Sequence, residues 1–368
     1  MKRTPSGKRF AAAALALLLL AALSLAGCGT APSDTDRGAT RSFTDSAGRT
    51  VEISEEIDAI APSGSYAQLF LVTLCPEKLM GLSTALTRNQ KTYLPAYLQD
   101  LDIFGQFYGG SGTVNYEAIM AADPDMIIDI GEKKDTIRED MDGIQEKTKI
   151  PTVFLETSLL TSEENYETLG ALTGCEKRAG ELADYCREVL ELAQTNTAAL
   201  SDGERARVYV GDGEYGTSAI PAGTVHSEVM DVVGAVNVAE LGDRAASGMQ
   251  EVSMEQILLW NPEAVFLTTD ANYDEIYDDP GWSKVQAVQD HRVYEIPSAP
   301  YNWVDRPPSV QRMLGILWMG NLLYPELYDY DMKEKMKEYY RLFYNYDMTD
   351  AEAAELLAHS AQAGGGDE

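Results

Sequence analysis

A long helix is predicted in the middle of the chain, from about residue 177 to residue 200. Apolar residues recur there every three or four positions, which is the spacing of one helix face: Ala179, Leu182, Tyr185, Val189 and Leu192. An unbroken helix of this length spans roughly 36 Å at 1.5 Å per residue. Gly174 separates it from a shorter helical stretch at residues 164–173.

One pattern of apolar and polar positions occurs on both sides of this helix, at residues 115–129 and, 138 positions later, at residues 253–267. Each copy begins with a helix-capping residue, has a glutamate in the first turn and an inward-facing isoleucine, and reaches a proline before an apolar run. The pairs are Asn115 and Ser253, Glu117 and Glu255, Ile119 and Ile257, and Pro124 and Pro262. The pattern predicts a short helix followed by a buried parallel strand in each half.

The remaining patterns extend this plan. Alternating apolar residues around Gly48 predict a hairpin at residues 41–53. Short apolar runs predict strands at residues 59–61, 79–82, 103–105, 126–130, 152–155, 207–210 and 292–296, and a helix is expected at 309–323. Strands alternating with helices through two halves predict an α/β fold with two Rossmann-like lobes, each with an open parallel sheet, joined by the long helix.

The first 28 residues are predicted to be a secretion signal. Four basic residues precede an apolar stretch of 16 residues, and small residues lead to Cys28. The apolar stretch is short for a membrane span of about 20 residues. The segment resembles a bacterial lipoprotein signal, in which Cys28 becomes a lipid-bearing N-terminus, so we expect a protein anchored to the extracytoplasmic face of the bacterial cell membrane.

Composition and length limit the expected partners, the number of domains and the disulfides. The formal net charge is −30 and becomes −34 without the four basic signal residues, so nucleic acid is not an expected partner. The length favours two domains. Cys175 and Cys186 would lie about 16 Å apart on one helix, too far for a disulfide, and free thiols are expected. We assign residues 1–28 to the signal, 29–41 to a tether, 42–160 to an N-terminal lobe, 161–202 to the linker helical region, 203–345 to a C-terminal lobe and 346–368 to a C-terminal helix and disordered tail.

Several segments together resemble a known family. They are FTDSAGRTVEI, NYEAIMAADPDMII, SMEQILLWNPEAVFL, GTVHSEVMDVVGAVNVAEL, DDPGWSKVQAVQDHRVYEIP and RPPSVQRMLGILWMGNLLYPELY. Their order and spacing resemble the solute-binding lipoproteins of bacterial ABC importers for ferric siderophores, haem and cobalamin. The resemblance implies a monomeric receptor without enzymatic activity or cofactor, which holds a small-molecule ligand between two lobes and delivers it to a permease powered by a cytoplasmic ATPase. It implies an iron(III) chelate as first choice, with haem, cobalamin, molybdate or tungstate as alternatives.

Candidate ligand-binding residues follow from the fold class. Ligands of open α/β sheets lie beyond the carboxyl ends of the strands, so a cleft between two sheets is lined by both sets of loops. Arginine can bind an anion through its planar fork, and aromatic side chains provide flat apolar walls. The candidates are Ser63, Ser65, Tyr66, Arg88, Tyr108, Lys133, Tyr215, Tyr273, Tyr301, Trp303 and Arg306. Each has a structural alternative, since Trp303 could be core packing and Arg306 could pair with an acidic residue.

Other functional classes have weaker support. Residues 211–216 match the spacing of a dinucleotide-binding loop, but the following residues do not begin a helix. Three histidines, His226, His291 and His359, are too few to predict a zinc site. His226 could reach the cleft or merely precede a helix, and we expect the latter. A secreted α/β enzyme and a purely structural surface lipoprotein are the two alternative classes. Turnover would reveal the first, and absence of saturable ligand binding the second.

Overall fold

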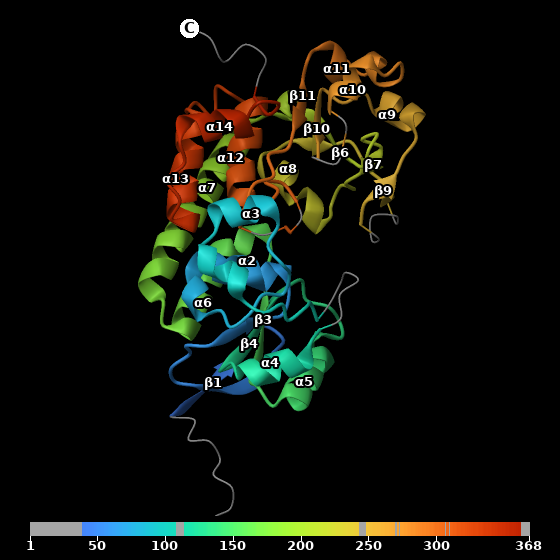
Figure 1. Ribbon diagram of the computed structural model, residues 1–368. Helices are drawn as coiled ribbons and strands as arrows, with labels where there is room; N and C mark the ends of the chain where they lie inside the picture. The colour runs from blue at the N-terminus through green and yellow to red at the C-terminus, as the bar shows by residue number, and fades with distance from the viewer. Residues whose placement is uncertain are drawn as a thin grey trace, which may run out of the picture. The chain divides into compact units, whose positions relative to one another are not determined.

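The two halves predicted from the repeat each contain a β-sheet (Figure 1), parallel in the first half and mainly parallel in the second. The structure is a computed structural model that describes residues 39–107, 114–242, 248–268, 271, 273–305, 307–308 and 310–361. The signal region with Cys28, two of the site candidates (Tyr108 and Arg306) and residues 362–368 lie outside this description. Residues from Arg41 onward form a single unit. Within the described residues, no helix combines the length and apolar character needed to cross a membrane.

The secondary structure follows the chain in three groups. The first half contains β1 (Thr40–Thr44), β2 (Thr50–Ser54), β3 (Ile60–Pro62), α2 (Ser65–Leu74), α3 (Arg88–Tyr93), α4 (Tyr116–Ala122), β4 (Met126–Gly131), α5 (Ile137–Thr148) and β5 (Thr152–Glu156). Next come α6 (Ser162–Thr173) and α7 (Glu176–Ala199). The second half contains β6 (Arg207–Asp212), β7 (Ser218–Ala219), α8 (Glu228–Val232), β8 (Val236–Asn237), β9 (Gln250–Glu251), α9 (Met254–Trp260), β10 (Ala264–Leu267), α10 (Tyr273–Asp278), α11 (Gln286–Gln289) and β11 (Val293–Glu295), and then α12 (Arg312–Leu323), α13 (Met332–Tyr344) and α14 (Asp350–Leu356).

The sheet of the first half has the order β3-β4-β5, and all its pairings are parallel. The predicted hairpin is confirmed as the separate pair β1-β2. The strands expected at residues 79–82 and 103–105 are reduced to isolated bridges, Ile60 with Leu79 and Leu82 with Ile103. The ring of Phe104 packs directly against Gly81 there.

The sheet of the second half has the order β11-β10-β6-β7-β9, with β8 paired to β6. The strands β6, β10 and β11 pair in parallel as predicted. The sequence patterns did not indicate β8, which pairs in parallel with β6, or the antiparallel edge formed by β7 and β9. Gly213 and Gly216 have φ values of 75° and 65°, which lets the chain reverse between β6 and β7. The glycine motif at residues 211–216 therefore does not begin a helix, as its following residues indicated, and leads into β7 instead.

The repeat predicted from the sequence is confirmed in detail. Asn115 accepts a hydrogen bond from an N–H in the first turn of α4, and Ser253 does the same for α9. Ile119 and Ile257 are fully buried. Each helix ends at a left-handed residue immediately before the predicted proline, with φ of 48° at Asp123 and 42° at Asn261. A buried parallel strand follows each helix, β4 in one half and β10 in the other.

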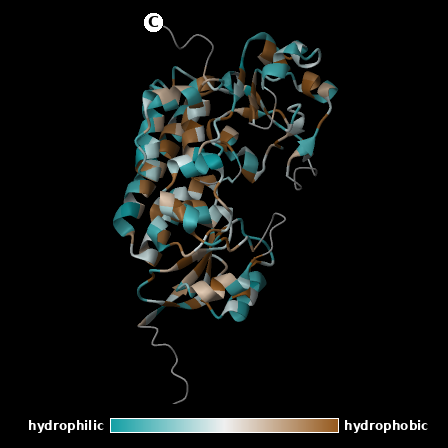
Figure 2. Cartoon of the chain, in the orientation of Figure 1, coloured by the Kyte–Doolittle hydropathy of each residue, from teal (hydrophilic) through white to brown (hydrophobic). Residues whose placement is uncertain are grey.

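The predicted long helix is α7, and it joins the two halves. Gly174, with φ of 69°, separates it from α6. Helix α7 contacts α2 and α6, which precede it in the sequence, and α8 and α12, which follow it. Alternate residues of β4, β6 and β10 enter one shared hydrophobic core, and the residues between them face a smaller core behind each sheet. Figure 2 shows the apolar strands of the first sheet and the mixed faces of the helices.

Candidate ligand-binding site

A cavity of about 320 Å³ lies at the carboxyl ends of β3 and β4. This is the edge of an open α/β sheet at which ligands bind. Residues of the first half form most of its wall, and Pro307 comes from the second half. The lining residues are Ser63, Gly64, Ser65, Tyr66, Gln106, Asp129, Ile130, Gly131, Glu132, Lys134, Ile137, Phe154 and Pro307.

Helix α2 begins at this cavity with its first N–H groups unused by the helix. Gly64 is the N-cap residue and has no side chain to accept a hydrogen bond from them. The first bond of the helix runs from Gln68 N–H to Gly64 O at 2.9 Å, so the N–H groups of residues 65–67 precede the helical ladder. The first turn contains no acidic residue. This end of the helix therefore has a partial positive charge and favours an anion.

Ser63 and Asp129 form a buried pair where β3 and β4 end. The backbone of Ser63 is fixed on both sides, since its N–H donates to Ile128 O at 3.0 Å and its carbonyl accepts from Phe107 N–H at 2.9 Å. Its hydroxyl donates to Asp129 Oδ1. Burial raises the pKa of Asp129 to about 6, although the Ser63 hydrogen bond and the charge of Lys134 act in the opposite direction. The carboxyl group can thus change its protonation near neutral pH.

The second half contains the same kind of pair with the strand order exchanged. There the carboxylate of Asp212 lies at the end of β6, and it accepts a hydrogen bond from the hydroxyl of Thr268 at the end of β10. Both pairs join the ends of neighbouring parallel strands. The internal repeat therefore includes a hydroxyl–carboxylate pair at the strand ends, in addition to the helices and strands.

Tyr66 connects the cavity with charged groups of the second half. Burial raises the pKa of its phenol above the ordinary value, an effect that Arg312 opposes and that Asp305, Glu132 and Glu228 strengthen. The hydroxyl therefore stays protonated at neutral pH and remains a hydrogen-bond donor. The guanidinium of Arg312 is 2% exposed, and a buried cation of this kind needs partners.

Glu228 holds Arg312 and also joins the two halves. Its Oε2 accepts from Arg312 Nη1 at 2.7 Å and from the backbone N–H of Leu159 at 3.1 Å. Arg312 Nη1 also donates to Val225 O at 2.8 Å. His226 does precede the helix α8, as expected, and in addition its Nδ1 lies 2.6 Å from Asp305 Oδ1. In the described part of the chain, no three His, Cys, Asp or Glu side chains converge to hold a metal ion.

Three of the sequence candidates, Ser63, Ser65 and Tyr66, lie together in the cavity wall. Arg88 is exposed at the first turn of α3. Lys133 is exposed and donates to Ser46 O at 2.9 Å. Ligand contact by the last two stays a prediction.

The aromatic candidates of the second half lie elsewhere. Trp303 is fully buried and packs edge-on against Trp318, with ring centroids 6.2 Å apart, and Tyr301 is also part of the hydrophobic core. Tyr273 stacks on His359 at 4.5 Å, and Tyr215 is 65% exposed. These four side chains do not line the cavity, and their contact with a ligand stays a prediction.

The structure adds residues that the sequence patterns did not single out. The sequence could have indicated Asp129, because a carboxylate inside an otherwise apolar strand needs a partner. It could also have indicated Arg312, which is a charged residue at the start of the apolar helix α12. No sequence pattern could have indicated Gln106 and Glu228, since their positions depend on how separate segments pack.

A comparison with protein families matches residues 73–300 to a family described as periplasmic binding protein. The chain belongs to this family. Its relatives include the molybdate-binding protein MolA of Haemophilus influenzae, which is 27% identical over 261 residues, covering 64% of this chain and 71% of MolA. The uncharacterized ABC transporter substrate-binding lipoprotein YvrC of Bacillus subtilis is 26% identical over 299 residues, covering 76% and 88%.

The fold of this periplasmic binding protein is also that of solved structures. An ABC transporter solute-binding protein from Sulfurospirillum deleyianum superposes with a TM-score of 0.80 at 28% identity, covering 86% of this chain and 99% of that one. The resemblance noted in the sequence and the expected two-lobe α/β fold are thus confirmed. This periplasmic binding protein is an extracytoplasmic solute-binding component of an ABC transporter.

Proposed function

We propose that this periplasmic binding protein captures a small tetrahedral oxyanion of the molybdate and tungstate class. The observation that carries the proposal is the N-terminus of α2, which has no side-chain cap and no acidic residue and begins at the cavity wall. Backbone N–H groups at a helix N-terminus bind anions through hydrogen bonds and the helix dipole together.

The surrounding side chains fit the same chemistry. The hydroxyl groups of Ser65 and Tyr66 can donate hydrogen bonds to oxyanion oxygens, and Tyr66 stays protonated. Arg312 provides a buried positive charge that acts on Tyr66. Hydrogen bonds to a charged group contribute about 1.5–3 kcal/mol each, so a few such donors are sufficient for tight binding of a small anion.

The cavity volume and one similar protein also support an oxyanion as the ligand. A volume of about 320 Å³ is at the lower end of the range for small-molecule sites, about 300–1,000 Å³. A ferric siderophore or haem would need more room at this edge of the sheet than an oxyanion. MolA, 27% identical, is named a molybdate-binding protein.

Isothermal titration calorimetry on the detergent-purified full chain tests this proposal, with molybdate, tungstate, sulfate, phosphate, ferric catecholates, ferric hydroxamates, haem and cobalamin as ligands. We expect saturable binding of molybdate and tungstate and a higher Tm in their presence. Binding of an iron chelate, haem or cobalamin without binding of either oxyanion would refute the proposal. The cargo would then be the bound compound itself, and the receptor role would stand.

We further propose that the receptor is a monomer, is anchored through lipid on Cys28 and hands its ligand to a permease without chemical change. Metabolic labelling with a radioactive fatty acid should label the wild-type chain and fail with Cys28→Ser. A labelled Cys28→Ser chain would exclude this anchor. Recovery of unaltered molybdate from the complex tests the absence of turnover, and light scattering tests the monomer.

A further inference from the structure

Two cysteines meet where α2 ends and α7 begins. Cys75 follows α2 directly, and its N–H donates to Leu71 O at 2.9 Å. Cys175 is the N-cap residue of α7. The two thiols lie close enough to shift each other's pKa, and both cysteines are free in the structure. Sequence spacing indicated no such pair, because the two residues are separated by most of the first half.

Side chains on both flanks hold the two segments together. Lys78, three residues after Cys75, donates from Nζ to Thr173 O at 2.8 Å. Arg178, three residues after Cys175, donates from Nη2 to Thr73 O at 3.5 Å. The two segments are thus hydrogen-bonded to each other on both sides of the cysteines. The thiols are therefore held near each other by fixed backbone and not by a mobile loop.

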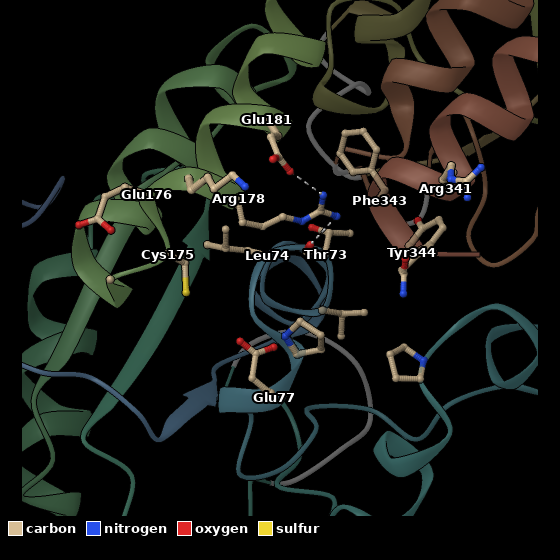
Figure 3. A pocket seen from close by; sticks show the side chains of 16 residues that line it. Thr73, Leu74, Glu77, Cys175, Glu176, Arg178, Glu181, Arg341, Phe343 and Tyr344 are labelled. Carbon is tan, nitrogen blue, oxygen red and sulfur yellow. Dashed lines mark hydrogen bonds and ion pairs between the residues drawn. The ribbon is translucent and has the colours of Figure 1, made fainter. Parts of the chain in front are cut away.

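The two thiols differ in access. Cys75 is fully buried, whereas Cys175 is partly exposed and lines an open cavity of about 680 Å³. Figure 3 shows the Cys175 side chain among the residues that line this cavity, together with Leu74 and Glu77. A reagent in solution can therefore reach Cys175 first.

The thiols also differ in acidity. The neighbouring Cys75 thiol lowers the pKa of Cys175; Thr173 and Lys78 act in the same direction, and burial and Glu77 oppose it. The same thiol contact and burial raise the pKa of Cys75. The other charged side chains around the cavity are Glu176, Lys177, Arg178, Glu181 and Arg341. A thiolate is the attacking species in thiol–disulfide exchange.

We propose that Cys75 and Cys175 are a redox pair that closes to a disulfide outside the cytoplasm. The oxidant is a low-molecular-weight disulfide or the disulfide of an oxidoreductase. The Cys175 thiolate attacks one sulfur of this disulfide, forms a mixed disulfide and releases one thiolate. Cys75 gives its proton to the released thiolate and attacks Cys175 Sγ, which releases the second thiolate. The two cysteines lose two electrons and two protons in total, one of them released to water when Cys175 ionises. The oxidant becomes two thiols, because its second thiolate takes up a proton from water.

The bond would connect the first helix of the N-terminal half with the linker helix. The closed loop contains α3, α4, α5, α6, β4 and β5. A cross-link across so long a loop restricts the unfolded chain, so the oxidised protein should have a Tm higher by at least about 5 °C.

The test treats the detergent-purified full chain with oxidised glutathione at pH 7 and maps its peptides without reduction. We expect a linked peptide pair containing Cys75 and Cys175, a higher Tm, and reversal of both by dithiothreitol. Cys186→Ser is the matched control, since Cys186 is a buried thiol on the same helix α7. It should behave as the wild type.

Two variants distinguish the roles of the thiols. Cys75→Ala should leave glutathione attached to Cys175, and Cys175→Ser should leave Cys75 unmodified. The rate of the first step should rise less steeply between pH 7 and 8.5 than that of an ordinary cysteine thiol, because the pKa of Cys175 is lowered. A stable glutathione adduct on Cys175 of the wild type, or no reaction at all, would overturn the proposal.

Discussion

The change Gly64→Asp tests directly whether an anion binds at the N-terminus of α2. Gly64 has φ of −170° and ψ of −175°, an extended backbone that any residue adopts. A Cβ at this position would have Gln106 Oε1 as its nearest neighbour, at 3.9 Å, which is an ordinary contact. The aspartate can therefore occupy the N-cap position and accept hydrogen bonds from the first turn.

The expected loss of affinity follows from two terms. The carboxylate takes over N–H donors that each contribute about 1.5–3 kcal/mol to a charged ligand. It also places a negative charge next to the ligand, and a pair of like charges about 5 Å apart costs roughly 3 kcal/mol at an effective dielectric constant of about 20. We expect a combined loss of at least about 3 kcal/mol, or about 100-fold in Kd for molybdate.

Stability should change in the opposite direction, which separates a binding defect from a folding defect. Aspartate is a slightly better N-cap than glycine, by a few tenths of a kcal/mol, and its charge interacts favourably with the helix dipole. The Tm without ligand should therefore be unchanged or slightly higher. The matched control Gly64→Ala adds a side chain without an acceptor or a charge, so it should lower the Tm slightly and keep the affinity within about threefold.

The assay is isothermal titration calorimetry with molybdate, together with thermal unfolding of the ligand-free protein. If Gly64→Asp binds molybdate as tightly as the wild type, the ligand does not use this helix end and the proposed site is wrong. If both variants lose affinity equally, the backbone conformation at Gly64 matters and not the N–H donors.

Four further substitutions, one of them a control, test other features. Asp129 becomes negatively charged as the pH rises through about 6, so molybdate affinity should fall about tenfold from pH 5.5 to 7.5, and Asp129→Asn should remove this dependence in calorimetric titrations. Since burial raises its folded-state pKa, Asp129 protonation stabilises the wild type below pH 6, and urea unfolding should show this contribution lost as the pH rises through 6. Gly315→Ala places a Cβ 1.9 Å from Trp303 O and should reduce the free energy of unfolding by about 1–3 kcal/mol. Gly180→Ala, with no atom within 4 Å of the new Cβ, should increase it by about 0.5–1 kcal/mol, and equal urea midpoints for the two would contradict the packing around Gly315. Trp303→Phe should lower the Tm and leave molybdate affinity unchanged, because Trp303 is fully buried in the core; a weaker affinity at unchanged Tm would instead support its predicted ligand contact.

The fold followed from the sequence wherever local rules decide. Asn115 and Ser253 cap their helices by accepting hydrogen bonds from backbone N–H groups three residues later, and the spacing along α7 indicates its buried face directly. The antiparallel edge of the second sheet was not predictable in the same way. Strands β7 and β9 are two residues long, too short to have a recognisable period.

The site was predictable to the extent that it is local. Ser63, Ser65 and Tyr66 follow one strand directly, so the class of fold places them at the sheet edge. Glu228 and Arg312 belong to helices far apart in the chain, and their meeting depends on tertiary packing. Trp303 illustrates a different difficulty, because a large aromatic ring suits a core and a ligand wall equally well.

The double role of Glu228 has a consequence for how this receptor exchanges its cargo. One carboxylate oxygen serves a guanidinium of the second half and a backbone N–H of the first. Pulling the halves apart at this point would strand at least one of these donors without an acceptor, at a cost of about 1–3 kcal/mol. The contacts of Glu228 therefore favour small rotations of the two halves about this point over a wide opening. Loading and release would then depend on movements of individual side chains at the mouth of the cavity.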